Sequence, residues 1–238
     1  MKIFKSKLSL LLSLLVISSC TNTKGWVYKA GSGDAFGQNY LQNKVMVVKP
    51  FSDKRSNENK NNIMLYVLPL MPFGYQDLST PEAITMHANS GLWVNYNPKE
   101  DFAKAMAEEF NSSDIFKEAY FSNSTRDSDY YVKGEILSTD YTSKMISYGF
   151  SFYGPLLWYI GFPATHVSND LEVKLSLIKT DSKKVIFSKT YKSDQYKKLG
   201  WIYNIPNDFR YSEMLGELYK EFLEDLVEDG FIKKGKKN

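Results

Sequence analysis

LEVKLSLIKTDSKKVIFSKTY, residues 171–191, carries the clearest structural pattern in this chain. In its first half, Leu171, Val173, Leu175 and Leu177 alternate with polar side chains. A period of two places these apolar side chains on one face of a β-strand. Turn-forming residues follow at 180–183, and the chain returns through a β-branched run. The stretch therefore predicts an antiparallel hairpin with one buried face.

Working outward, two more strands and two long helices are predicted. Residues 129–137 alternate like a strand with one wet face, and the β-branched run at 44–51 is typical of a buried strand. Residues 97–113 begin with Asn and Pro and carry an apolar stripe, and residues 211–229 repeat apolar side chains at helical spacing. Residues 114–120 are expected to add a short helical turn. The fold class predicted is α+β, a mainly antiparallel sheet packed by two principal helices, in one domain over residues 44–232.

The chain starts with MKIFKSKLSLLLSLLVISSC, in which three lysines precede an apolar run that stops before Cys20. A basic start, a short apolar run and small residues before a cut site are typical of a secretory signal, here residues 1–19. The run is too short to span a bilayer permanently, which needs about 20 apolar residues. Residues 17–20 resemble a bacterial lipobox, which implies that Cys20 carries a diacylglycerol thioether and an N-acyl chain. The alternatives are an ordinary signal peptide and a buried core thiol.

The residues after this cysteine are rich in glycine, and residues 20–43 are predicted to be a lipidated flexible tether. Thr21 is not the aspartate that retains enterobacterial-type lipoproteins in the inner membrane, which favours the outer membrane. The expected location is therefore the cell envelope, with the domain facing the periplasm. Residues 233–238 form a short basic tail, which is expected to be solvated.

Composition narrows the class of partner. The formal net charge is +3, and removal of Lys2, Lys5 and Lys7 leaves equal numbers of basic and acidic residues. A neutral chain argues against nucleic acid, which requires a basic face. Cys20 is the single cysteine, so the domain has no intramolecular disulfide and its core must provide the stability.

Three segments carry a resemblance to a known group. They read VMVVKPFSDKR at 45–55, DFAKAMAEEFNSSDIFKEAYF at 101–121 and SDYYVKGEI at 128–136. In their order, they resemble bacterial envelope lipoproteins whose domains are similar to the N-terminal domain of TolB, to CsgG and to the penicillin-binding-protein activators. The resemblance implies an α+β envelope domain. Two segments, 63–97 and 145–169, depart from the pattern.

The second of these segments, MISYGFSFYGPLLWYIGFPATHVSN at 145–169, contains no Asp, Glu, Lys or Arg. Glycines and prolines divide it into pieces too short to span a bilayer as one helix. Three interpretations stand. The segment could be buried on the sheet, next to the similarly apolar LPLMPFGY at 68–75. It could instead form an exposed patch that binds a partner protein or lipid, or insert into a membrane as part of a multisubunit pore. The candidate partner-binding residues are Tyr148, Phe150, Phe152, Tyr153, Trp158 and Tyr159.

Motifs for catalysis were sought next. His87 and His166 have no metal-ligand spacing around them, and the sequence has neither a glycine-rich phosphate loop nor a G-x-S-x-G elbow. No catalytic residue, metal or cofactor is therefore predicted. The expected function is that of a non-catalytic accessory or adaptor that binds another, unknown envelope component. The alternatives are a subunit of an outer-membrane export pore and an envelope-acting hydrolase whose polar groups only folding brings together.

Overall fold

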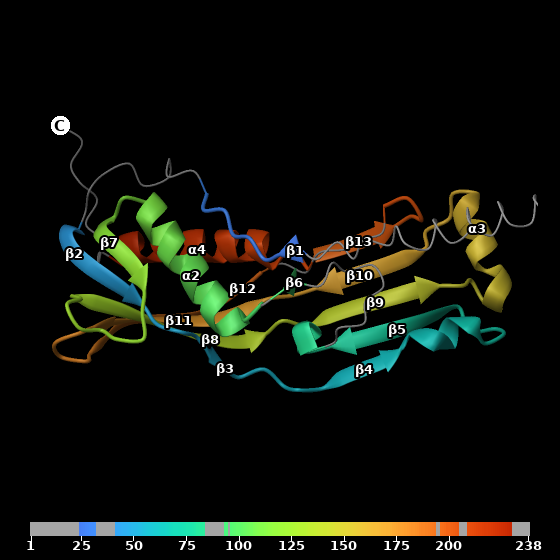
Figure 1. Ribbon diagram of the computed structural model, residues 1–238, viewed down its shortest axis with the longest axis horizontal. Helices are drawn as coiled ribbons and strands as arrows, with labels where there is room; N and C mark the ends of the chain where they lie inside the picture. Colours follow the sequence, from blue (N-terminus) through green and yellow to red (C-terminus); the bar gives the residue numbers. More distant parts are fainter. Residues whose placement is uncertain are drawn as a thin grey trace, which may run out of the picture.

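The computed structural model describes residues 24–31, 41–83, 93–94, 96–193, 196–204 and 209–229. Within these ranges the chain is α+β, so the predicted fold class is confirmed. A body made of one sheet and two helices continues into a long sheet of antiparallel strands, which we call the arm (Figure 1). Cys20, His87 and the basic tail lie outside the described residues.

The body sheet has the strand order β12-β11-β8-β2-β7, with β3 beside β8. The predicted hairpin is confirmed, because β11 and β12 pair antiparallel with Val173 opposite Tyr191. Strand β2 runs parallel to both of its neighbours, and β3 runs parallel to β8. The strands are β2 (Leu41–Val48), β3 (Ser52–Asp53), β7 (Phe116–Phe121), β8 (Tyr130–Ser138), β11 (Glu172–Lys179) and β12 (Val185–Lys192).

Two helices cover one face of this sheet, as the sequence predicted. They are α2 (Pro98–Ser112) and α4 (Tyr211–Glu228), and both contact strands of the body sheet as well as each other. Their apolar stripes are fully buried, for example at Phe102 in α2 and Phe222 in α4. The core of the body therefore lies between the sheet and this helix pair.

The arm sheet has the order β13-β10-β9-β5-β4 and is antiparallel throughout. Only two residues separate β8 from β9, and two separate β10 from β11, so one long antiparallel ribbon runs through body and arm (Figure 1). The arm strands are β4 (Asn59–Asn62), β5 (Phe73–Leu78), β9 (Tyr141–Ile146), β10 (Thr165–Asn169) and β13 (Tyr196–Gly200).

The helical turn expected at residues 114–120 is wrong, because this segment forms β7 at the edge of the body sheet. Strand β7 pairs parallel with β2, with Ala119 opposite Met46. Ile115 and Phe116 are buried, in agreement with the inward orientation that their apolar character suggested. A partner strand about 70 residues away in the sequence overrides the local preference of this short segment.

The flexible tether predicted for residues 20–43 is wrong for residues 24–31 and for the last residues before position 44. Strand β1 (Lys24–Gly25) pairs parallel with β6 (Trp93–Val94), and strand β2 already begins at Leu41. The ordered domain therefore begins earlier than residue 44.

Aromatic side chains hold this early segment against the helices. Tyr28 is buried and donates a hydrogen bond to Oε2 of Glu109 over 2.7 Å. The ring of Trp26 lies 6.2 Å from that of Phe102, measured between centroids. Burial of two large aromatic side chains outweighs the conformational freedom that nearby glycines provide.

Two segments of the family resemblance contact each other in the body. Phe51 ends the VMVVKPF stretch and is buried, and its backbone N–H donates to the carbonyl of Lys99 over 2.8 Å. The ring of Phe51 lies flat against Gly134 of strand β8, where a Cβ atom would overlap the ring carbons. The glycine is therefore required by packing.

We expect Gly134→Ala to lower the free energy of unfolding by about 2 kcal/mol, because the added methyl overpacks the contact with Phe51. Chemical denaturation measures the change, and Lys133→Ala on the exposed face of the same strand is the control. In a Phe51→Leu background the cost of Gly134→Ala should shrink, since a shorter side chain leaves room for the methyl group. Equal costs in both backgrounds would contradict the proposed contact.

Candidate functional site at the end of the arm

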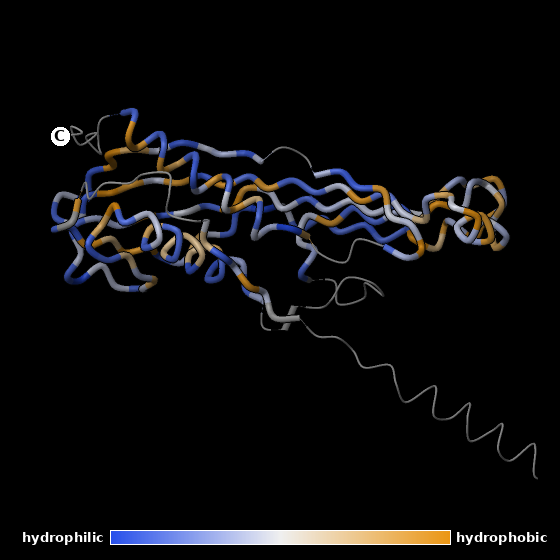
Figure 2. Tube along the Cα trace, turned by 90° about the horizontal axis from the view of Figure 1, so that it is seen from above, coloured by the Kyte–Doolittle hydropathy of each residue, from blue (hydrophilic) through white to orange (hydrophobic). Residues whose placement is uncertain are grey.

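Two loops without charged residues meet at the far end of the arm. No Asp, Glu, Lys or Arg occurs at residues 61–76 or 145–169. The first loop contains the 3-10 helix η2 (Ile63–Val67), and the second contains η4 (Ser151–Tyr153) and α3 (Pro155–Tyr159). We call residues 63–72 and 147–163 the apolar tip. Figure 2 shows hydrophobic residues gathered there, beyond the more polar strands of the arm.

Backbone hydrogen bonds join the two loops. The N–H of Leu70 donates to the carbonyl of Gly149 over 3.0 Å, and the N–H groups of Ser147 and Tyr148 both donate to Pro72 over 2.9 Å. The two segments 68–75 and 145–169 therefore contact each other, as the burial interpretation had considered. The loops contact each other mainly through their backbones.

Two glycines let each loop fold closely onto its own neighbouring backbone. A Cβ atom on Gly74 would overlap the backbone of Ile63, and one on Gly154 would overlap the backbone of Ser147. Tyr148, Gly149 and Ser151 have left-handed backbone angles, with φ of 58°, 82° and 52°. These angles end strand β9 at Ile146, so residues 147–153 turn away from the sheet and do not continue the strand.

Most large side chains of the tip face outward. Leu70 is 88% exposed, Phe152 is 74% exposed and Tyr153 is 75% exposed. Burial of this segment, one of the three interpretations, therefore fails for its middle, although its ends form β9 and β10. The other exposed large apolar residues of the tip are Met64, Leu68, Met71, Phe150, Leu156, Tyr159, Ile160 and Phe162.

The six candidate partner-binding residues separate into two groups. Phe150, Phe152, Tyr153 and Tyr159 are exposed at the tip. Two others are half-buried and hold the tip together: the hydroxyl of Tyr148 donates to the carbonyl of Pro163 over 2.6 Å, and Nε1 of Trp158 donates to that of Ile146 over 2.8 Å.

Sequence reasoning missed the aliphatic members of the tip, among them Leu70, Leu156 and Ile160. The absence of charge in residues 61–76 was the signal that would have found the first loop. Emphasis on aromatic side chains, which are enriched at interfaces, directed attention away from these aliphatic residues.

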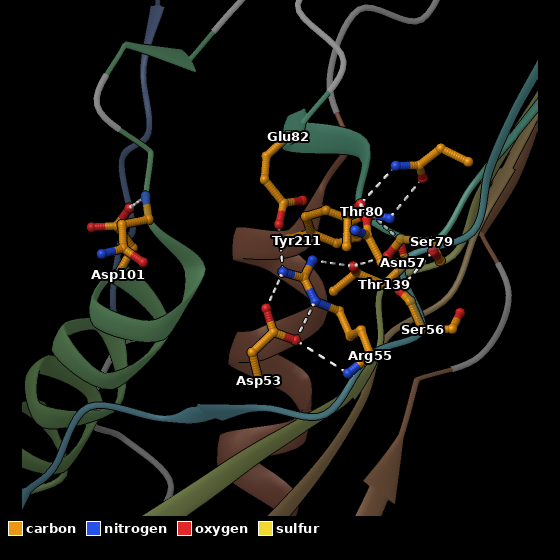
Figure 3. A network of polar contacts seen from close by, with 12 residues as sticks. Asp53, Arg55, Ser56, Asn57, Ser79, Thr80, Glu82, Asp101, Thr139 and Tyr211 are labelled. Carbon is orange, nitrogen blue, oxygen red and sulfur yellow. Dashed lines mark hydrogen bonds and ion pairs between the residues drawn. The ribbon is translucent and has the colours of Figure 1, made fainter.

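A buried polar network joins the arm to the body, and we call it the joint (Figure 3). The side chain of Arg55 is 3% exposed and donates from Nε and Nη2 to the two oxygens of Asp53, over 2.9 and 2.7 Å. Nη1 donates to Oγ1 of Thr139 over 2.7 Å, and Nη2 also pairs with Glu82. The fork of donors on arginine suits such bidentate pairing.

Thr139 is fully buried between strands β8 and β9, where it links three parts of the fold. Its hydroxyl donates to the carbonyl of Ser79, just after strand β5, over 3.0 Å. Its own carbonyl accepts a hydrogen bond from the Tyr211 hydroxyl, at the start of α4, over 2.8 Å (Figure 3). The joint therefore fixes the body, the arm and a helix relative to one another. No pattern in the sequence predicts the joint, because residues 52–62 look like an ordinary polar loop.

A pocket of about 220 Å³ lies next to the joint. Glu58, Asp77 and Asp140 line it together with Lys60 and several hydroxyl groups. Burial, with Asp170 nearby, raises the pKa of Asp140. Within the described ranges, no three His, Cys, Asp or Glu side chains gather closely enough to hold a metal ion.

His166 lies on strand β10, between Lys144 of β9 and Leu199 of β13. Burial lowers the pKa of its imidazole, and the charges of Lys144 and Lys197 lower it further. This strand face therefore carries positive charge immediately behind the tip. Of the helices in the described parts of the chain, none has the length and apolar character needed to cross a membrane.

No family model matches the chain, and no curated protein matches it. Solved structures with a related shape include a Xanthomonas campestris protein of the family described as DUF330, at 12% identity and a TM-score of 0.47, covering 86% of this chain and 94% of that one. PelC from Paraburkholderia phytofirmans, solved as a dodecamer, has 12% identity and a TM-score of 0.37, with coverage of 79% and 91%. A hypothetical protein from Chlamydia trachomatis has 10% identity and a TM-score of 0.38, with coverage of 81% and 99%.

These likenesses are too distant to carry an argument about function. The resemblance to the TolB, CsgG and activator group stays a prediction.

We expect Arg55→Met to lower the free energy of unfolding by about 3 kcal/mol at pH 7, because two carboxylates at the joint lose their cationic partner. The hydrogen bonds from Arg55 hold the pKa of Asp53 below its ordinary value. The stabilisation is therefore present above the unfolded-state pKa of about 4, and it is lost as the pH falls through the lowered pKa of the folded state. Urea denaturation between pH 3 and 8 measures the difference.

Arg126→Met, at an exposed arginine, is the control and should change stability by less than about 0.5 kcal/mol. A cost for Arg55→Met that stays constant below pH 4 would argue against the pairing with Asp53.

Proposed function

We propose that this protein is a lipid-anchored, non-catalytic adaptor of the bacterial cell envelope, which binds another envelope component through the apolar tip. Acylated Cys20 holds it in a membrane, by expectation the outer one, with the domain in the periplasm. The observation that carries the proposal is the tip, where eleven large apolar side chains are more than one-third exposed on two loops in contact.

Exposure of this kind requires an explanation, because soluble proteins rarely leave contiguous apolar patches in water unless the patch binds something. The tip is also held in place. The ribbon of β8, β9, β10 and β11 carries it, and the joint fixes that ribbon to the body. A rigid support lowers the entropy that is lost when the tip binds its target.

The segment between the lipid-bearing cysteine and the folded domain is short. Residues 24–31 lie against the body, so only Thr21, Asn22 and Thr23 separate Cys20 from Lys24. Four Cα steps span at most about 14 Å when fully extended. A lipid on Cys20 would therefore keep the body close to the membrane surface, which restricts where the tip can reach.

The hydrolase alternative has less support. The pocket beside the joint is small, and its carboxylates, Glu58, Asp77 and Asp140, lie beside Lys60 and hydroxyl groups without a histidine in the lining. The tip offers aliphatic and aromatic side chains, which bind but do not transfer protons. Binding is the activity that these side chains suit best.

A photoreactive phenylalanine analogue in place of Phe152 tests the proposed contact in the bacterium that produces the protein. We expect a covalent adduct with an envelope component after illumination, because Phe152 is 74% exposed at the tip. The matched control is the same analogue at Val185, which is 52% exposed on strand β12 of the body. Equal labelling at both positions, or none at Phe152, would count against the tip as the binding surface.

Cys20→Ser tests the anchor separately. The wild-type chain should incorporate labelled palmitate and remain in the membrane fraction after a high-salt wash, because two or three acyl chains anchor a protein durably. The variant should incorporate no label. Incorporation that survives Cys20→Ser would show that the lipid is attached elsewhere or that the lipobox is not used.

A further inference from the structure

We propose that the envelope component bound by the apolar tip is a lipid bilayer with anionic headgroups, into whose interface the tip inserts. This inference rests on the proposed function, since it names the partner of the same surface. Three observations point to lipid: many polar groups of the tip form hydrogen bonds within it, its exposed side chains are uncharged, and lysines lie on the strands behind it.

The backbone of the tip satisfies its own hydrogen bonds. In the turn that contains η4, the N–H groups of Phe150, Tyr153 and Gly154 donate to carbonyls three residues earlier, over 3.0 Å each. Around α3, the N–H groups of Leu157, Ile160, Gly161 and Phe162 donate to carbonyls of residues 154–158, over 2.9 to 3.3 Å. Between the two loops, the N–H groups of Leu70, Ser147 and Tyr148 donate to backbone carbonyls. A lipid environment requires this, because it offers no hydrogen-bond partner.

Polar side chains of the tip are satisfied in the same way. The hydroxyl of Ser147 donates to the carbonyl of Met71 over 2.7 Å, and that of Ser151 donates to the carbonyl of Val67. Trp201, beside the tip on the chain that follows β13, donates from Nε1 to the carbonyl of Gly161 over 3.1 Å. A protein interface typically exchanges one hydrogen bond per 100–200 Å². The tip instead offers few free donors for such exchange, which favours lipid over protein.

The exposed side chains suit the depth of an interfacial site. Phe152, Leu156 and Ile160 present only hydrocarbon, whereas Tyr153 and Tyr159 add a hydroxyl to an apolar ring. Tyrosine and tryptophan concentrate at the level of the headgroups, where one end of the side chain is dry and the other is wet. The tip therefore combines hydrocarbon side chains with amphipathic tyrosine rings.

Two lysines on the arm strands place positive charge behind the exposed side chains of the tip. Lys144 lies on β9, two residues before the strand ends, and its Nζ is 4.8 Å from the centroid of the Phe73 ring. Lys197, on β13, is close enough to His166 to affect its pKa, as Lys144 is. Two strand residues span about 7 Å, so Lys144 reaches the phosphates when the tip enters to a depth of 5–10 Å. Lys197 lies level with Thr142, two residues further back, where its long side chain still adds to the attraction of an anionic surface. On the same sheet face, Asp77 pairs opposite Lys60, further from the tip.

Vesicle binding by a chain that lacks the acylated cysteine tests the inference. All described residues fall after Thr21, so a chain from Thr21 to Asn238 keeps the whole fold. We expect it to float with vesicles of 70% phosphatidylcholine and 30% phosphatidylglycerol. The double variant Phe152→Asp/Leu156→Asp should bind at least about tenfold more weakly, because two exposed apolar anchors become charged. Val185→Asp, on the body, should bind like the wild-type chain.

A second variant tests the lysines. Lys144→Gln/Lys197→Gln should lose the preference for anionic over neutral vesicles, with a loss of about tenfold or more on the anionic ones, since each lysine near a charged surface contributes to attraction. Both lysines lie at the surface of the arm, and circular dichroism confirms that each variant is folded. Equal binding of both vesicle types by the wild-type chain would overturn the proposed role of charge.

The outcomes separate this inference from the proposed function. If the folded wild-type chain binds no vesicles, or if the Asp double variant binds as well as the wild type, the bilayer is not what the tip binds. In the first case, an adduct with a protein at Phe152 in cells would keep the adaptor function and replace its partner. Absence of both vesicle binding and adducts would overturn both proposals.

Discussion

One antiparallel ribbon organises this molecule. Strand β8 continues into β9 and β10 continues into β11, so the same two chain segments serve the body sheet and the arm sheet. Register in the body therefore sets register in the arm, since a shift of one residue would turn the buried faces of both sheets outward. The position of the tip follows from pairing that begins at Tyr130 and Lys179, at the opposite end of the ribbon.

The ribbon passes from the body sheet to the arm sheet at the joint, and polar contacts stabilise this junction. Where the two sheets meet, Asp170 accepts hydrogen bonds from the hydroxyl of Ser138 and the N–H of Asp140, over 2.9 and 3.0 Å. Thr139 and Arg55 satisfy the groups on the inner side. Backbone N–H and C=O groups between the two sheets have no strand partner and need such hydrogen bonds, because a buried backbone group without a partner lowers the stability of the fold. The hydroxyl of Tyr211, at the start of α4, donates to the carbonyl of Thr139, so helix α4 is bonded to this junction as well.

The sequence predicted the elements whose side chains repeat with a clear period: the hairpin at 171–191 and the helices α2 and α4. Prediction from the sequence failed where the structure of a segment depends on contacts with residues far away in the chain. Residues 116–121 are a strand because β2 lies beside them, and residues 24–31 are ordered because Tyr28 and Trp26 reach the helices. Composition also did not distinguish a buried aromatic segment from an exposed one. That outcome depends on left-handed turns after β9, at positions such as Tyr148 and Ser151, which non-glycine residues rarely adopt.

The construction of the tip explains how such an apolar surface remains ordered. A loop usually becomes compact by burying its large side chains, which would leave few of them for binding. Here Gly74 and Gly154 let each loop fold closely onto its own backbone, and hydrogen bonds join the two loops. Trp158 and Tyr148 contribute one bond each from partly buried rings, and Phe152, Leu156 and Leu70 remain outside. The close contact of backbones, made possible by glycine, is therefore what leaves the hydrocarbon side chains available at the end of a rigid arm.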